Sequence, residues 1–113
     1  MRAAFVTKWT TPVPGREMAA IAYGRDVDDF FAKKAADGLC TEPKWFWAPT
    51  GENLWFVEGE YETLLEIYAT PEVQEFLVKG PILVQNFGYA LYQVGRDELF
   101  GRYEEALTKL GIH

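Results

Sequence analysis

The sequence predicts an α+β fold in which helices cover one face of a four-stranded antiparallel sheet. Segments that alternate with period two are separated by segments whose apolar residues recur every three or four positions. Their order is β, α, β, β, α, β, with an added C-terminal helix. The chain has 113 residues, 49% of them apolar, which is enough for one hydrophobic core. No repeat, linker or low-complexity tract interrupts it, so we expect a single domain over residues 1–113.

The first strand and the first helix are expected over residues 3–11 and 16–37. In the strand, Phe5, Thr7 and Trp9 share one side, and prolines follow directly. The helix carries one apolar stripe made of Ala20, Tyr23, Val27, Phe30 and Phe31. Gly24 lies in its middle, which leaves open a kink or a division into two pieces.

A β-hairpin is expected next. Residues 42–48 contain two tryptophans and a phenylalanine, residues 49–53 have the composition of a turn, and residues 54–59 alternate as a second strand. Aromatic residues occur on both sides of these strands, so both faces of the hairpin are expected to be covered.

Two helical pieces and a last strand complete the pattern. Residues 61–69 have helical spacing, and a second piece begins with the N-cap sequence Thr70-Pro71-Glu72 and runs to residue 79, where Gly80 and Pro81 are expected to end it. Residues 87–94 alternate as the final strand. Residues 96–110 form a charged helix, whose apolar stripe is expected to pack beneath a solvated face. The stripe consists of Leu99, Phe100, Tyr103, Leu107 and Leu110.

This order is the split βαβ pattern of a ferredoxin-like sandwich. Helices cover only one sheet face in such a fold, whereas several of these strands are apolar on both faces. A second copy of the chain would cover the other face, so the sequence predicts a sheet-to-sheet homodimer.

Composition and charge exclude several function classes. The net charge of −6 argues against nucleic acid and anionic membranes as partners, and no apolar run is long enough to cross a bilayer. The only histidine is His113 at the end of the chain, where fraying is expected, so neither a metal site nor a cofactor is predicted. The single cysteine, Cys40, and the absence of a signal sequence indicate the cytoplasm.

Three segments resemble the dimeric α/β-barrel superfamily: residues 56–64, residues 69–76 with their Thr-Pro-Glu step, and the aromatic strand 87–92. The resemblance covers most of residues 3–94 and implies a ferredoxin-like dimer. The superfamily includes cofactor-independent monooxygenases, isomerases, polyketide cyclases and haem enzymes. The cyclases place histidines where this chain has Thr7 or Lys8 and Glu72 or Val73, and the haem branches need a histidine ligand, so those activities are not carried over.

The richest cluster of aromatic side chains suggests a ligand site. We expect a flat slot suited to a planar apolar ligand, formed with Glu58 as its carboxylate and with the candidate binding residues Trp9, Lys44, Trp45, Trp47 and Trp55. The alternative is that these aromatic residues simply fill the dimer interface. That interpretation is favoured, because aromatic residues dominate cores and interfaces.

Glu58, Tyr61 and Tyr89 are the candidate catalytic residues. Glu58 lies between apolar neighbours, so partial desolvation would raise its pKa and suit it to act as a base, with a tyrosine as proton donor. The alternative pairs Glu58 with Lys8 or Lys44, or leaves it solvated. The sequence thus predicts a small homodimer that binds a planar apolar molecule. The alternative is a cofactor-independent monooxygenase, isomerase or cyclase acting on an aromatic or polyketide-like substrate.

Overall fold

The computed structural model describes residues 1–112, and within them the chain forms four strands and four helices. The elements in order are β1 (Arg2–Trp9), α1 (Glu17–Ala36), β2 (Lys44–Trp47), β3 (Asn53–Glu60), α2 (Tyr61–Tyr68), α3 (Pro71–Leu83), β4 (Gly88–Gln93) and α4 (Arg96–Lys109). The expectation about the terminal histidine, His113, lies outside the described residues.

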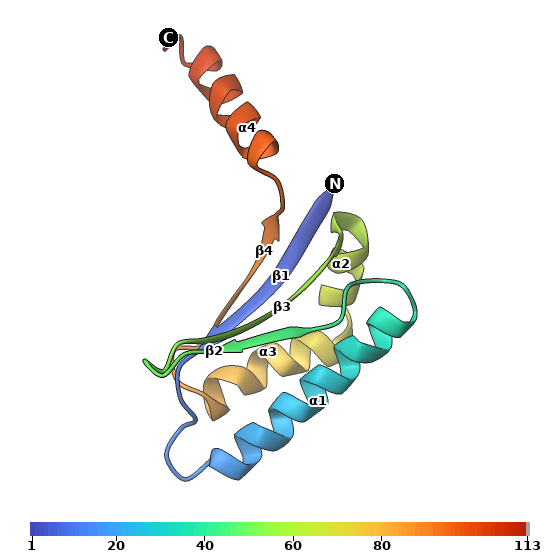
Figure 1. The fold of residues 1–113 in the computed structure, drawn as a ribbon, viewed down its shortest axis with the longest axis vertical. Helices are drawn as coiled ribbons and strands as arrows, with labels where there is room; N and C mark the ends of the chain where they lie inside the picture. The colour runs from blue at the N-terminus through green and yellow to red at the C-terminus, as the bar shows by residue number, and fades with distance from the viewer. Residues whose placement is uncertain (113) are drawn as a thin grey trace.

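The sheet is antiparallel throughout, with the strand order β2-β3-β1-β4. Helices α1, α2 and α3 lie on one side of it, and no helix within residues 1–112 covers the other side (Figure 1). This is the ferredoxin-like α+β arrangement that the sequence predicted.

Strand register assigns each side chain to one of the two sheet faces. Thr7 pairs with Trp55 and Tyr89, which places all three on the face that the helices cover. Ala4 pairs with Glu58 and Tyr92 on the opposite face, which we call the open face. Its apolar members are Ala4, Val6, Phe46, Leu54, Phe56, Ala90 and Tyr92.

The hydrophobic core lies between the helix-covered face and the helices. Its buried residues are Ala3, Phe5, Val27, Phe31, Trp55, Val57, Leu64, Ile67 and Val73. The predicted stripe of α1 is confirmed, because Ala20, Val27 and Phe31 are buried and Phe30 packs on Phe76 of α3. Helix α1 is continuous from Glu17 to Ala36, so Gly24 does not divide it.

The predicted end of α3 is wrong: the helix continues through Gly80 and Pro81 to Leu83. A proline inside a helix has no amide hydrogen to donate, but only two residues of α3 follow Pro81, and the Val84 amide still donates to the Gly80 carbonyl at 2.9 Å. The Ile82 carbonyl beyond it accepts a hydrogen bond from the Arg16 side chain at 2.8 Å, which ties the last turn to the start of α1. The predicted N-cap is confirmed, since the Thr70 hydroxyl accepts from the Val73 amide.

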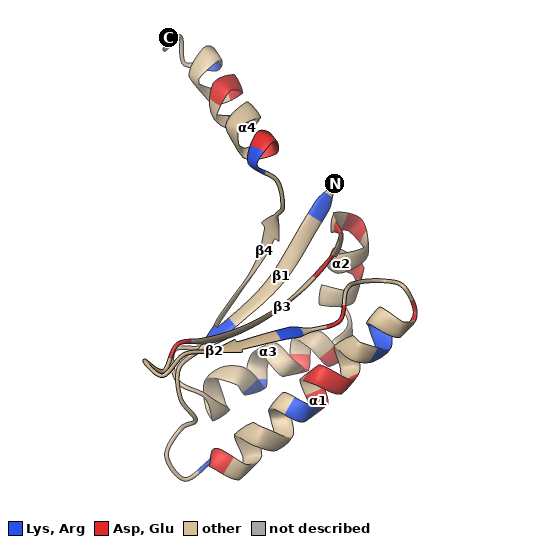
Figure 2. Cartoon of the chain, in the orientation of Figure 1, with Lys and Arg blue, Asp and Glu red and all other residues tan. Residues whose placement is uncertain are grey.

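Helix α4 does not pack on the rest of the chain, contrary to the expectation that its apolar stripe would be covered. It extends beyond β4, away from the sheet and the other helices (Figure 1), and every one of its residues is exposed. Both acidic and basic residues lie along α1 and α4 (Figure 2). Because all of α4 is exposed, its charged side is solvated as predicted, but its apolar side has no partner within residues 1–112.

Candidate functional site

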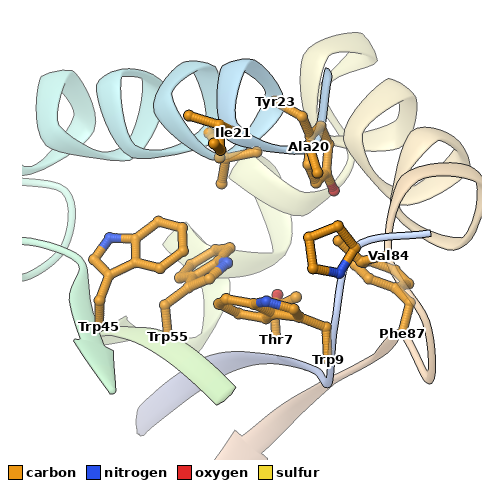
Figure 3. A pocket seen from close by; sticks show the side chains of 12 residues that line it. Thr7, Trp9, Ala20, Ile21, Tyr23, Trp45, Trp55, Val84 and Phe87 are labelled. Atoms are coloured by element: carbon orange, nitrogen blue, oxygen red, sulfur yellow. The ribbon is translucent and has the colours of Figure 1, made fainter. Parts of the chain in front are cut away.

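A cavity of about 240 Å³ lies between the helix-covered sheet face and α1. Side chains from β1, β2 and β3 form its floor, and side chains from α1 form its roof (Figure 3). We call it the tryptophan pocket, since it is lined by three of the four tryptophans. Its lining residues are Thr7, Trp9, Pro12, Ala20, Ile21, Tyr23, Gly24, Val27, Trp45, Trp55, Val84 and Phe87.

The space exists because α1 presents small residues to the tryptophans. Ala20 and Gly24 lie one helical turn apart and both line the pocket. A Cβ added at Gly24 would meet no atom within 4 Å. The missing side chain thus leaves space in the roof of the pocket above Trp45 and Trp55.

The three tryptophans form an aromatic array along the pocket. The ring centroids of Trp9 and Trp45 are 5.5 Å apart and nearly perpendicular, and those of Trp45 and Trp55 are 5.8 Å apart. The indole Nε1 of Trp45 donates a hydrogen bond to Asp28 of α1 at 2.7 Å, which fixes the ring against the helix. Trp45 is 39% exposed and Ile21 is 47% exposed, so the pocket reaches solvent beside them.

Tyr23 contributes its ring to the pocket but not a free hydroxyl. The hydroxyl donates to the Phe76 carbonyl of α3 at 2.7 Å. Burial raises the pKa of Tyr23 to about 12, so the hydroxyl keeps its proton at ordinary pH. The lining is otherwise apolar except for Thr7 and the indole groups, which suits a planar apolar ligand.

The structure brings together only part of the predicted binding set. Trp9, Trp45 and Trp55 share the tryptophan pocket, whereas Lys44 lies on the open face and Trp47 is 79% exposed at the sheet edge. Trp47 lines a separate, open hollow of about 530 Å³ together with Phe46, Asn53 and Asn86, among others.

Glu58 lies on the open face, so the single slot that the sequence suggested for Trp45, Trp47 and Glu58 is not formed within one chain. Alternation along β3 puts Glu58 on the opposite side from Trp55. Its carboxylate lies 3.9 Å from the Arg2 guanidinium, and its side chain is about one-third exposed. The expected partners Lys8 and Lys44 are replaced by Arg2.

The two candidate tyrosines lie apart from each other. Tyr61 begins α2 and is half-buried against the core. Tyr89 is on the helix-covered face beside Thr7, and its ring is 6.0 Å from that of Phe87, which lines the pocket. Hydrogen bonding to the Tyr68 side chain raises the pKa of Tyr89, which favours the protonated, donor form.

Nine of the twelve lining residues were not predicted as site residues, among them Thr7, Tyr23 and Phe87. Asp28, which holds the Trp45 ring from outside the lining, was not predicted either. The alternation and the helical stripe did place Thr7 and Tyr23 on the same sides as core residues. Nothing local distinguishes a core position from a cavity position, because the cavity arises from Gly24 on another element.

Cys40 and acidic clusters offer no second site in the part of the chain that the structure describes. Burial raises the pKa of the Cys40 thiol, which packs against the core. Among residues 1–112, no group of three or more His, Cys, Asp or Glu side chains could hold a metal ion. None of the helices in that range is long and apolar enough to span a bilayer.

Solved structures show the same fold at low sequence identity. Rv0793 from Mycobacterium tuberculosis is 15% identical with a TM-score of 0.64, over 84% of this chain and 96% of that one. SnoaB, a cofactor-independent oxygenase from Streptomyces nogalater, is 11% identical with a TM-score of 0.63, over 84% of this chain and 94% of that one.

A putative antibiotic biosynthesis monooxygenase from Chloroflexus aurantiacus is 16% identical with a TM-score of 0.54, over 84% of this chain and 95% of that one. No family model and no curated protein matches the sequence. These likenesses confirm the ferredoxin-like fold that the sequence predicted.

Proposed function

We propose that this protein binds a planar, largely apolar small molecule in the tryptophan pocket. The observation that carries the proposal is a 240 Å³ cavity lined by Trp9, Trp45 and Trp55 and kept open by Gly24. Large aromatic rings normally fill such a space themselves, because protein interiors are close-packed. Indole faces offer offset or edge-to-face stacking to a flat aromatic ligand.

The proposal predicts that filling the cavity abolishes binding. The probe is 2-naphthol, a planar two-ring phenol, titrated into ¹⁵N-labelled protein while the four indole N–H signals are followed by NMR. We expect the signals of Trp9, Trp45 and Trp55 to shift in a saturable manner and that of Trp47, outside the pocket, to stay in place. Gly24→Leu should remove the response, because its side chain enters the cavity.

Ala22→Leu is the matched control, since it adds the same side chain at an exposed position of α1. It should leave the titration unchanged. Binding by Gly24→Leu with wild-type affinity, or a response confined to Trp47, would contradict the assignment of the pocket.

Catalysis is the second candidate function, favoured by the structural likeness to SnoaB, a cofactor-independent oxygenase. An anthrone is the simplest test substrate: one anthrone and one dioxygen give one anthraquinone and one water, with the substrate supplying the electrons. Tyr89, beside the pocket, would donate a proton, and Tyr61 is the other candidate donor. Glu58 lies across the sheet from the tryptophan pocket, so it would act as base only on a substrate held at the open face, where a second chain meets it.

Oxygen uptake and quinone absorbance measure this reaction directly. Loss of turnover in a folded Glu58→Gln variant would support Glu58 as base. Unchanged turnover would remove Glu58 from the mechanism, and no turnover by the wild type would leave ligand binding as the function.

The protein is also proposed to act as a homodimer. The open face exposes apolar side chains, with Phe46 and Tyr92 each nearly half exposed, and α4 exposes its whole apolar stripe. An isolated helix of 14 residues is marginal in water, so α4 needs a partner surface. Two uncovered apolar surfaces on one chain suit a symmetric pair, in which each copy covers the other.

The solvent-exposed area of the chain also supports a homodimer. The chain exposes 7647 Å², whereas compact monomers of its 12.9 kDa mass expose about 6,300 Å². The excess of about 1,300 Å² per chain, taken over two chains, falls within the range of roughly 2,000–5,000 Å² that obligate homodimers bury.

A further inference from the structure

Thr7 occupies the centre of the sheet beneath the tryptophan pocket. It lies in the middle of β1, between Trp55 on β3 and Tyr89 on β4, and only 4% of it is exposed. Figure 3 shows its side chain on the pocket floor, flanked by the rings of Trp55 and Trp9.

The Thr7 hydroxyl is an unpaired polar group. Among residues 1–112, Thr7 Oγ1 is the one buried side-chain nitrogen or oxygen without a hydrogen-bond partner. Leaving a buried donor or acceptor unsatisfied costs about 1–3 kcal/mol of stability. Valine has nearly the same shape and would fill this position without that cost, so the oxygen contributes nothing to the packing of the free protein.

Two of the neighbouring polar groups are already engaged, whereas the indole N–H groups of Trp9 and Trp55 can only donate. The Tyr23 hydroxyl is bonded to the Phe76 carbonyl, and the Trp45 N–H is bonded to Asp28. The hydroxyl of Thr7 is thus unengaged, and its oxygen lies just beneath the floor of the aromatic pocket, covered by its neighbours in the free protein. It can both donate and accept a hydrogen bond.

We infer that Thr7 is the hydrogen-bond anchor of the ligand, and that the ligand is a planar aromatic molecule with a hydroxyl or carbonyl oxygen on its edge. This inference rests on the proposed binding function. A flat ring lying along Trp9 and Trp55 places its edge over β1, where the oxygen meets Thr7. Purely hydrocarbon rings would leave the hydroxyl unpaired and bind less well.

The test compares two probes of the same shape, 2-naphthol and 2-methylnaphthalene, which differ by a hydroxyl in place of a methyl group. Dissociation constants for both are measured by indole N–H titration in the wild type, Thr7→Val and Thr7→Ser. The relevant quantity is the ratio of the two constants within each protein, because any general change in the pocket affects both probes.

We expect the preference for 2-naphthol to fall by roughly 2- to 10-fold in Thr7→Val, the value of one neutral hydrogen bond, and to be retained in Thr7→Ser. An unchanged ratio in Thr7→Val, with both probes still bound, would overturn the inference and leave the pocket assignment intact. Failure of the wild type to bind either probe would overturn both.

A second measurement does not depend on any ligand. If the hydroxyl is unpaired in the free protein, Thr7→Val should unfold at the same denaturant concentration as the wild type or at a higher one. A clear loss of stability in Thr7→Val would show that the hydroxyl already has a partner, which also overturns the inference.

Discussion

Tyr23 connects the tryptophan pocket to the helix layer. Its ring lines the pocket, while its hydroxyl, bonded to the Phe76 carbonyl at 2.7 Å, holds α1 against α3. Ionisation of this hydroxyl would bury a charge, which is why the pKa of Tyr23 is raised. Because of this burial, the stability of the folded chain is expected to change with pH in the alkaline range.

The sign of this dependence follows from the two pKa values of Tyr23, 10.0 for an ordinary tyrosine and about 12 in the folded chain. Its contribution to stability is fully present below pH 10 and is lost as the pH rises towards 12, because the unfolded chain releases the proton first. Denaturant unfolding at successive pH values should therefore show a smaller alkaline decline for Tyr23→Phe. Tyr61→Phe, at the start of α2 and outside the proposed dimer surfaces, is the control and should keep the wild-type slope. Equal slopes in Tyr23→Phe and the wild type would contradict the assignment.

At the level of elements, two helical glycines have opposite roles. Gly24 in α1 faces the open pocket, and a Cβ there would meet nothing within 4 Å. Gly80 in α3 is buried, and a Cβ there would overlap the ring of Phe87, which lines the other end of the pocket. One glycine leaves space for a ligand and the other allows close packing.

Alanine substitutions should separate these roles. Gly24→Ala is expected to stabilise the protein by about 0.5–1 kcal/mol, because alanine is the better helix former. Gly80→Ala is expected to destabilise it by about 1–3 kcal/mol, since the Phe87 ring must shift. Urea unfolding of both variants measures the difference, and effects of the same sign would contradict this account of the helices.

The sequence predicted the type and order of every element, but it misplaced the C-terminal end of α3 and the packing of α4. Periodicity and N-cap chemistry at Thr70 act locally, so they can be recognised from neighbouring residues. The continuation of α3 beyond Pro81 is accompanied by contacts that are distant in sequence, since Arg16 and Val13 donate hydrogen bonds to the Ile82 and Leu83 carbonyls. The pocket was predicted only in part. Alternation along a strand shows which residues share a sheet face, but the pairing of Trp45 with Trp55 depends on the register of the hairpin.

At the scale of the whole molecule, the chain is more extended than a compact domain. Its radius of gyration is 16.6 Å, against about 13 Å for a compact chain of this length. Helix α4 accounts for the extension (Figure 1). The apolar stripe of α4 follows helical periodicity. Periodicity predicts that one face of the helix is apolar, but it does not show whether that face packs on the same chain or on a second chain. The open face and α4 together define the surface on which the homodimer is proposed to form.

Charge placed on these two surfaces should weaken the dimer. Sedimentation of the wild type at micromolar concentration is expected to give twice the 12.9 kDa chain mass. Tyr92→Lys on the open face and Phe100→Lys on α4 should each shift the equilibrium towards monomer, because a buried unpaired ammonium is costly. Met18→Lys is the matched control: Met18 is 77% exposed on α1, outside both surfaces, and its variant should sediment as the wild type does. A monomeric wild type would refute the dimer. A fully dimeric Phe100→Lys together with a dissociated Tyr92→Lys would restrict the interface to the sheet and leave α4 outside it.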